Sequence, residues 1–280
     1  MLRVLKFGVM GVTALALVAT GVLFYQGKSK PETTGEYVAL GSSFAAGLGL
    51  GPQVAGSPLI CMRSANGYPH RLARRLGLSL VDMSCSGSTT DHILRGGQVF
   101  LGPQLDAIGP KTQLVTITSG GNDVSYVSDL TLASGRGGVL GKLFWKGPKP
   151  LAERNFQGVS NNFLSIVTEI RKRAPSAKIV IVGYPAIVPI RGSCRKLGVK
   201  PEIVDLARDL AARLDKAARS AAERGGALFA DMGSRGADHD VCSSMPWVNG
   251  ANPSNGAPFH PTAQGAEAVA DAVVDVLLAI

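Results

Sequence analysis

Residues 113–123 read QLVTITSGGND, a short apolar and β-branched run that stops at a glycine-rich polar turn. Runs of this kind are typical of strands buried on both faces of a parallel sheet. Four similar runs occur elsewhere: YVAL (37–40), LSLVDM (78–83), KIVIVGY (178–184) and ALFADM (227–232). Together they predict a sheet of five buried strands.

Segments with helical spacing of apolar residues alternate with these runs, at 68–77, 158–174, 201–226 and 261–280. Pro201 and Pro261 stand where a first helical turn tolerates proline, and Gly225–Gly226 stand where a helix ends. Alternating strands and helices predict one doubly wound domain, a three-layer α/β/α sandwich. We assign this domain to residues 37–280, after a linker at 31–36.

The first thirty residues differ from the rest. Arg3 and Lys6 precede an uncharged stretch at residues 7–25. This stretch is nearly long enough to cross a hydrocarbon core about 30 Å thick and is longer than the usual core of a signal peptide. We therefore expect residues 1–30 to be a membrane anchor, with a cleaved signal peptide as the alternative. Either places the domain outside the cytoplasm, membrane-anchored or secreted.

The amino-acid composition limits the kinds of binding partner that we expect. The chain carries a formal net charge of +9, and only 6% of its residues are aromatic. A basic protein with so few aromatic side chains lacks stacking platforms for nucleic acid, so we expect no nucleic-acid partner. Attraction to anionic lipid or to a cell-wall polymer is the simpler expectation.

Four cysteines lie in the domain, at positions 61, 85, 194 and 242. An even count outside the cytoplasm predicts two disulfides, and four cysteines allow three pairings. No C-x-x-C pair is present, which argues against a zinc ribbon or a thioredoxin-type redox site. We expect no metal.

Reactive groups in an open parallel sheet collect beyond the carboxyl ends of the strands. Unusual turns follow three of the runs, GSSFAAG (41–47), CSGSTT (85–90) and SGGND (119–123), and a fourth segment, FHP (259–261), precedes the last helix. Each alone is ordinary turn or capping chemistry. Together they supply a serine, an imidazole and hydrogen-bond donors, which are the parts that acyl transfer through serine requires. Ser43, His260, Gly87 and Asn122 fit these roles.

The order and spacing of the four segments resemble the SGNH (GDSL-type) hydrolase family, and in particular its secreted actinobacterial-type lipases and esterases. GGND (120–123) and HPTAQG (260–265) are the most specific pieces. The resemblance implies a five-stranded parallel sheet of order 2-1-3-4-5 with helices on both faces. It implies Ser43 as nucleophile, His260 as general base, and an oxyanion hole formed by the backbone N–H groups of Ser43 and Gly87 with the Asn122 amide. No cofactor is implied.

Two positions depart from the family pattern. Ser42 stands where an aspartate usually precedes the nucleophile, and Ala257 stands where an aspartate usually orients the histidine. An imidazole needs such an orienting group to hold its tautomer. We expect the Ala257 backbone carbonyl to serve, which makes a Ser-His dyad. The alternatives are a carboxylate from another loop or a degenerate site, with three candidate carboxylates: Asp231, Asp238 and Asp240.

The resemblance also implies the disulfide pairing, Cys61–Cys85 and Cys194–Cys242. The expected activity is hydrolysis of a carboxylic ester, a small-molecule, lipid or acylated-glycan substrate, through an acyl-serine intermediate. The alternatives are an envelope acyltransferase that uses the same acyl-enzyme and a non-catalytic scaffold that binds glycan or lipid.

Residues 128–150 show no sustained period and are rich in glycine and lysine. We expect this segment to pass over the active-site face, with Phe144 and Trp145 forming a small satellite core. A lid or a membrane-contacting tip is the alternative.

Overall fold

The computed structural model describes residues 18, 20, 21, 24, 25, 31 and 33–279. Most of residues 7–25, the expected membrane segment, therefore lie outside the described residues, and the anchor or signal peptide stays a prediction. Among the residues that are described, no helix combines the length and the apolar character needed to cross a membrane.

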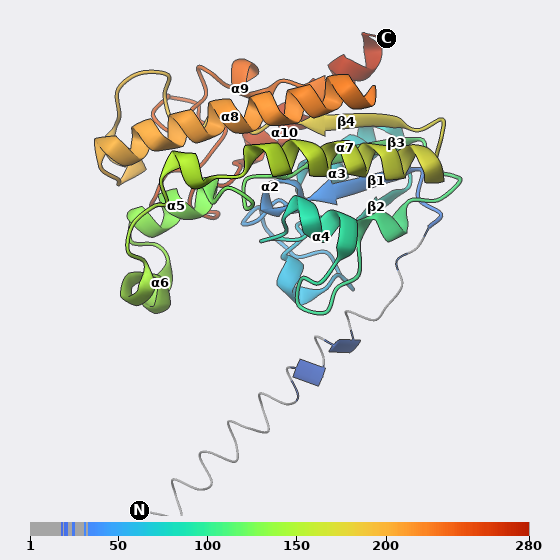
Figure 1. Cartoon of the computed structure of the whole chain (residues 1–280), viewed down its shortest axis with the longest axis horizontal. Coiled ribbons are helices and arrows are strands. Elements are labelled where there is room, and N and C mark those ends of the chain that lie inside the picture. The colour runs from blue at the N-terminus through green and yellow to red at the C-terminus, as the bar shows by residue number, and fades with distance from the viewer. Residues whose placement is uncertain (1–17, 19, 22–23, 26–30, 32, 280) are drawn as a thin grey trace, which may run out of the picture.

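A five-stranded parallel sheet forms the centre of the domain (Figure 1). Its strands are β1 (Tyr37–Gly41), β2 (Leu80–Asp82), β3 (Leu114–Thr118), β4 (Lys178–Val182) and β5 (Leu228–Ala230). They lie in the order β2-β1-β3-β4-β5. The predicted topology is therefore confirmed. β1 is an interior strand, with Tyr37 paired to Leu80 of β2 on one side and to Leu114 of β3 on the other.

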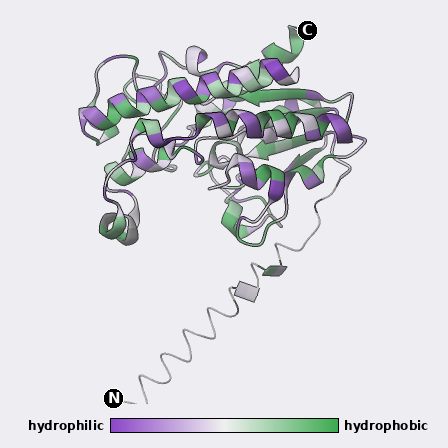
Figure 2. Ribbon diagram, viewed as in Figure 1, coloured by the Kyte–Doolittle hydropathy of each residue, from purple (hydrophilic) through white to green (hydrophobic). Residues whose placement is uncertain are grey.

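Helices cover both faces of the sheet. Five helices of the described chain are α3 (Tyr68–Leu76), α4 (Thr90–Arg95), α7 (Phe156–Arg173), α8 (Pro201–Gly225) and α10 (Ala263–Leu278). Short elements complete the described set: α2 (Ser43–Ala46), α5 (Tyr126–Ala133), α6 (Gly138–Phe144), α9 (Met232–Arg235), η1 (Leu59–Cys61), η2 (Gln104–Ala107), η3 (Leu151–Glu153) and η4 (Arg195–Leu197). Figure 2 shows apolar residues concentrated in the strands and polar residues distributed along the outer helices.

Side chains of each central strand alternate between two cores. Val38 and Leu40 of β1 belong to the core that α7 and α8 cover, whereas Tyr37 and Ala39 belong to the core under α3 and α10. All five residues of β1 are buried, because a strand in the middle of a sandwich has helices on both faces. This burial explains why these strands appear in the sequence as continuous apolar runs.

The structure corrects the expectation for residues 128–150. The segment contains two short helices, α5 and α6, and Phe144 is 69% exposed, so it forms no satellite core. Helices of seven or eight residues span about two turns, too few for a clear apolar period. The edge strands β2 and β5 are also shorter than the apolar runs that predicted them.

Candidate active site

Ser43 lies in a tight turn directly beyond the carboxyl end of β1. Gly41 has φ +145°, and a Cβ atom there would lie 2.3 Å from the Thr118 carbonyl oxygen, so the close approach to β3 requires glycine. The Ser42 N–H donates to that carbonyl at 2.9 Å. Ser43 then opens the short buried helix α2. The turn thus fixes the serine at the carboxyl edge of the sheet.

His260 lies in the loop before α10, and a neighbouring loop holds its backbone on both sides. The Asn249 N–H donates to the His260 carbonyl at 2.9 Å, and the Phe259 N–H donates to the Asn249 carbonyl at 3.2 Å. Phe259 is fully buried and has φ +57°, an uncommon conformation for a residue with a large side chain. Thr262 caps α10 by accepting a hydrogen bond from the Gly265 N–H at 3.0 Å. The imidazole is therefore carried by a well-supported turn.

These two residues, far apart in the chain, meet at hydrogen-bond distance. Ser43 Oγ lies 2.8 Å from His260 Nε2, and both side chains are largely buried. The other ring nitrogen, Nδ1, lies 2.8 Å from the carbonyl oxygen of Pro258. With Nδ1 donating to Pro258, Nε2 is free to accept the proton of the serine hydroxyl.

The orienting carbonyl differs from the one expected. The Ala257 carbonyl accepts the backbone N–H of His260 at 3.3 Å and closes the turn, so it does not serve the ring. The next carbonyl along the chain, that of Pro258, faces Nδ1 instead. The expected type of orienter, a backbone carbonyl, is present, but it belongs to Pro258.

The candidate carboxylates are placed away from the imidazole. Asp231 caps α9 and pairs with Arg219 at 2.8 Å, and Asp240 accepts the Cys242 N–H at 2.6 Å. Within the described residues no carboxylate oxygen lies within 4 Å of a ring nitrogen of His260. Burial lowers the pKa of His260, and the hydrogen bond to the Pro258 carbonyl opposes this effect in part.

Hydrogen-bond donors lie on the loops after β2 and β3. In the described part of the chain, no group accepts the backbone N–H of Ser43 or Gly87. Asn122 is half-buried and donates one amide hydrogen to the Ser88 carbonyl at 2.8 Å. Its second amide hydrogen and the two backbone N–H groups are thus available to a developing oxyanion.

A family comparison agrees with this geometry. The model of the GDSL-like Lipase/Acylhydrolase family matches residues 39–268, a span that contains Ser43, Gly87, Asn122 and His260. The chain belongs to this family.

Three similar proteins match at least 86% of the chain. Lipase 2 of Streptomyces coelicolor is 34% identical, over 98% of this chain and 97% of that protein. The crystal structure of an extracellular lipase from Streptomyces rimosus has a TM-score of 0.71 and 27% identity, and the match covers 86% of this chain and 98% of the other. A phospholipase A1 from Streptomyces albidoflavus follows with a TM-score of 0.69 and 25% identity, covering 87% and 99%.

Gln104 joins the turn at the end of β1 to the loop after β2 and was not anticipated from the sequence. Its buried amide accepts the Gly41 N–H at 2.8 Å and donates to the Gly41 carbonyl at 3.0 Å and to Ser88 Oγ at 2.9 Å. It therefore ties the end of β1 to the loop that carries Gly87. Its surroundings in the sequence, GPQLDA (102–107), contain no signal beyond a turn.

Tyr184 was also missed. Its hydroxyl lies 3.2 Å from Ser42 Oγ and accepts the Gly121 N–H at 3.2 Å, so it connects the nucleophile turn to the loop that carries Asn122. Burial raises the pKa of Tyr184 to about 12, which keeps the hydroxyl protonated. The available signal was its position at the end of the run KIVIVGY, beyond the carboxyl end of β4.

Asp123, the last residue of the GGND turn, connects the loop after β3 to the start of α4, which follows the loop after β2. It accepts hydrogen bonds from the Thr90 N–H at 3.0 Å and the Thr90 hydroxyl at 2.5 Å. Burial raises the pKa of this carboxyl, while the bonds from Thr90 lower it. The loops bearing Gly87 and Asn122 are thereby held in one arrangement.

Two disulfides cross-link loops around the site. Cys61 pairs with Cys85, and Cys194 pairs with Cys242, as the family resemblance implied. The Ser88 N–H donates to the Cys85 carbonyl at 2.9 Å, which couples the first disulfide to the loop of Gly87. The second disulfide joins the loop after β4 to the segment that leads to Asn249, the residue that supports His260.

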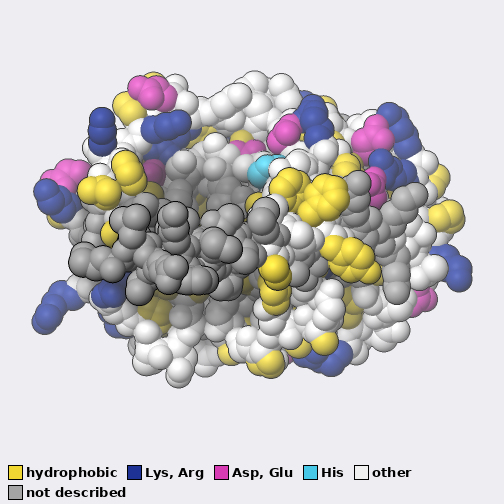
Figure 3. Space-filling model, turned by 90° about the horizontal axis from the view of Figure 1, so that it is seen from below, with side chains coloured by type: hydrophobic (Ala, Val, Ile, Leu, Met, Phe, Trp, Pro, Cys, Tyr) yellow, Lys and Arg dark blue, Asp and Glu magenta, His cyan; other side chains and the backbone are white. Residues whose placement is uncertain are grey.

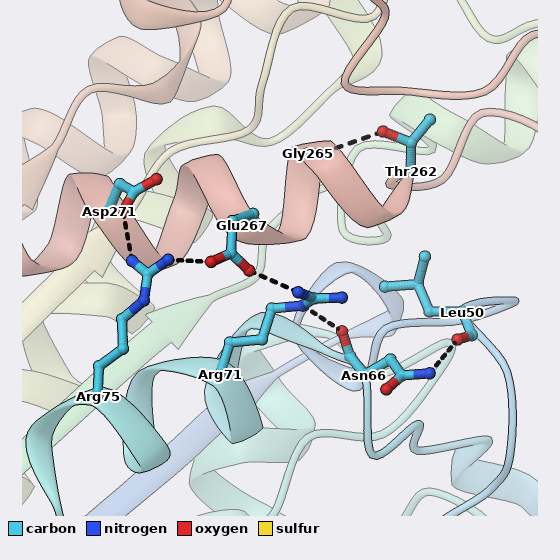
Figure 4. Close-up of polar contacts among 8 residues, drawn as sticks. All are labelled: Leu50, Asn66, Arg71, Arg75, Thr262, Gly265, Glu267 and Asp271. Carbon is cyan, nitrogen blue, oxygen red and sulfur yellow. Dashed lines mark hydrogen bonds and ion pairs between the residues drawn. The ribbon is translucent and has the colours of Figure 1, made fainter.

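Figure 4 shows how α10, which follows His260, is fastened to α3. Glu267 of α10 pairs with both Arg71 and Arg75 of α3. Arg71 also donates to the Asn66 carbonyl at 2.9 Å, and the Asn66 amide donates to the Leu50 carbonyl at 2.9 Å. This chain of contacts links the helix after the histidine to the loop after the serine.

Among the described residues, no group of three or more His, Cys, Asp or Glu side chains could hold a metal ion.

Proposed function

We propose that the protein is an extracytoplasmic serine hydrolase of carboxylic esters in which Ser43 is the nucleophile and His260 the general base. As Ser43 Oγ attacks the ester carbonyl carbon, its proton passes to His260 Nε2. The tetrahedral oxyanion is stabilised by the N–H groups of Ser43 and Gly87 and by the Asn122 amide. His260 then protonates the departing alcohol and leaves an acyl-serine. Water, activated by the same imidazole, releases the acid.

The contact between Ser43 Oγ and His260 Nε2 carries this proposal. Pro258 holds the tautomer that makes Nε2 an acceptor, and the positive charge that develops on the ring in the transition state faces the carbonyl dipole of Pro258. The proposed unit is therefore a Ser-His dyad oriented by backbone, which replaces the carboxylate of a full triad. The names of the relatives, lipases and a phospholipase A1, support lipid esters as the substrate class.

Two disulfides support a location outside the cytoplasm, where such bonds persist. We propose that residues 7–25 either anchor the domain at the membrane or are removed as part of a signal peptide. Mass spectrometry of the N-terminus of protein recovered from the producing cell separates the two.

The test of the nucleophile is covalent labelling. A fluorophosphonate probe should modify Ser43 in the folded protein, and Ser43→Ala should lose both the label and hydrolysis of a short-chain ester. Ser119→Ala is the matched control, because Ser119 is another buried serine beyond a strand of the same sheet. Labelling or hydrolysis that survives in Ser43→Ala would exclude Ser43 as the nucleophile.

The sequence left two alternatives open, acyl transfer to a glycan and non-catalytic binding. No specific observation favours either of them. Lipase 2 and the two enzymes of known structure named above are hydrolases by name. The contacts of His260 with Ser43 and Pro258, and that of Asn122 with Ser88, support catalysis over non-catalytic binding.

A further inference from the structure

Helix α6 exposes large apolar side chains to solvent. Val139, Leu143 and Phe144 are 81%, 71% and 69% exposed, although α6 has only seven residues. Single exposed apolar residues are ordinary on a protein surface, but three on one short helix form a patch that points to an interaction. We call these three residues, with the adjoining Trp145, the α6 tip.

Buried polar contacts hold the base of the segment that carries the α6 tip. Arg154 and Asp129, both buried, form an ion pair at 2.7 Å where the segment leaves and rejoins the domain. Arg154 also donates to the Val124 and Lys149 carbonyls. Figure 1 shows α6 standing away from the rest of the domain, on the side of the carboxyl ends of the strands. That is the edge at which Ser43 and His260 meet.

The charged residues of the segment that carries the tip all have one sign. Residues 130–152 contain four cationic side chains, Arg136, Lys142, Lys146 and Lys149, and no Asp or Glu. Arg136, Lys146 and Lys149 are exposed. Figure 3 shows the molecule from below, the side toward which α6 projects in Figure 1, and hydrophobic, basic and acidic side chains are all visible on this face. Apolar tips flanked by cations are complementary to an interface in which hydrocarbon lies beneath anionic headgroups.

We propose that the α6 tip is a membrane-contact element that inserts into the surface of an anionic phospholipid bilayer. Val139, Leu143 and Phe144 enter the headgroup and acyl boundary, while the surrounding cations bind the headgroups. This contact brings the carboxyl edge of the sheet to the lipid. Membrane contact by the α6 tip does not require the chemistry of Ser43. It can therefore be tested independently of the proposed hydrolysis.

The test requires a reporter local to α6, because residues 7–25 are themselves predicted to enter a membrane. The chain has two tryptophans, and Trp145 belongs to the tip whereas Trp247 is half-buried against His239. The full chain carrying Trp247→Phe therefore reports on Trp145 alone. In vesicles of phosphatidylglycerol, we expect its emission to shift to the blue and to be quenched by brominated acyl chains. In vesicles of phosphatidylcholine the quenching should be much weaker.

Substitutions around the tip test each contribution. Lys146→Gln should lower the partition constant for phosphatidylglycerol vesicles, measured by titrating the quenching with lipid, about fivefold, since each cation near an anionic surface contributes about 1 kcal/mol. Lys216→Gln, an exposed lysine on α8, is its control and should change nothing. Leu143→Ser should reduce quenching in the same way, whereas Leu278→Ser, an equally exposed position at the end of α10, should not. All variants should hydrolyse a soluble short-chain ester at the parent rate, and Ser43→Ala should retain the quenching.

Several outcomes would overturn the proposal. One is a Trp145 emission that is the same in buffer and in phosphatidylglycerol vesicles. Another is quenching of equal strength with phosphatidylcholine or unaffected by salt, because an anionic contact is screened. A blue shift that grows with protein concentration in the absence of lipid would indicate that the tip binds a second copy of the chain and not a membrane.

Discussion

His260 Nδ1 lies 2.8 Å from the carbonyl oxygen of Pro258, a neutral group two residues earlier in the chain. A carboxylate at that place would stabilise the imidazolium and raise the histidine pKa. Here burial has the larger effect, and the pKa of His260 falls below its ordinary value of 6.5.

This relationship predicts the pH dependence of hydrolysis. Neutral imidazole is the active form, so kcat/KM should fall with acid along a limb whose midpoint lies below pH 6.5. Because the pKa is lower in the folded than in the unfolded state, the contribution of His260 to stability is complete above pH 6.5 and is lost as the pH falls through the lowered pKa. An acid limb with its midpoint above 6.5 would instead indicate a carboxylate partner.

Tyr184→Phe should lower kcat about tenfold and leave the KM for a small ester nearly unchanged. The substitution removes the hydroxyl that binds Ser42 Oγ and leaves the Gly121 N–H unpaired, and an unsatisfied buried donor costs about 1–3 kcal/mol. Tyr126→Phe is the matched control, because Tyr126 packs against Tyr184 but its hydroxyl lies outside this set of hydrogen bonds. If kcat fell equally in the two variants, the Tyr184 hydroxyl would have no specific role beyond packing.

Gln104→Glu should destabilise the domain and slow hydrolysis. A carboxylate keeps the shape of the amide but cannot donate to the Gly41 carbonyl or to Ser88, and it places a charge in a buried site. We expect a loss of about 1–3 kcal/mol in the free energy of unfolding in urea, with a lower kcat at temperatures where the variant is folded. The exposed Gln157→Glu should remain within about 0.5 kcal/mol of the parent.

Arg154→Ala should lower the free energy of unfolding by about 3–5 kcal/mol, because it leaves the buried Asp129 carboxylate without its partner. The exposed pair between Arg95 and Asp91 provides the comparison, and Arg95→Ala should cost less than about 1 kcal/mol. Similar urea midpoints for the two variants would contradict the assigned role of Arg154 at the base of α6.

Part of the active site could be predicted because its residues follow the strands directly. Ser43, Gly87 and Asn122 each follow the carboxyl end of a strand, and parallel strands end at the same edge. The supporting residues could not be predicted in this way. Gln104 reaches the site from a short helix, and its hydrogen bonds join Gly41 and Ser88, which lie 63 and 16 positions earlier in the chain.

The sequence also did not predict which backbone carbonyl contacts the ring of His260. Ala257 and Pro258 are adjacent, and either carbonyl could serve a histidine that follows closely. The turn decides, because the Ala257 carbonyl closes it and Phe259 adopts a positive φ. Similarly, the composition of residues 128–150 did not reveal that Phe144 is exposed, because exposure depends on what lies opposite a side chain.

The sequence by itself determined the α/β architecture, since strands buried on both faces must be continuously apolar and helices must repeat with their own period. It also determined the types of group available for chemistry. Only the tertiary structure decided that Ser43 Oγ and His260 Nε2, from residues 217 positions apart, lie 2.8 Å from each other and that the Pro258 carbonyl rather than that of Ala257 contacts Nδ1 of the ring. The physical reason is that hydrogen bonding depends on distances of a few tenths of an ångström, which the packing of distant loops sets.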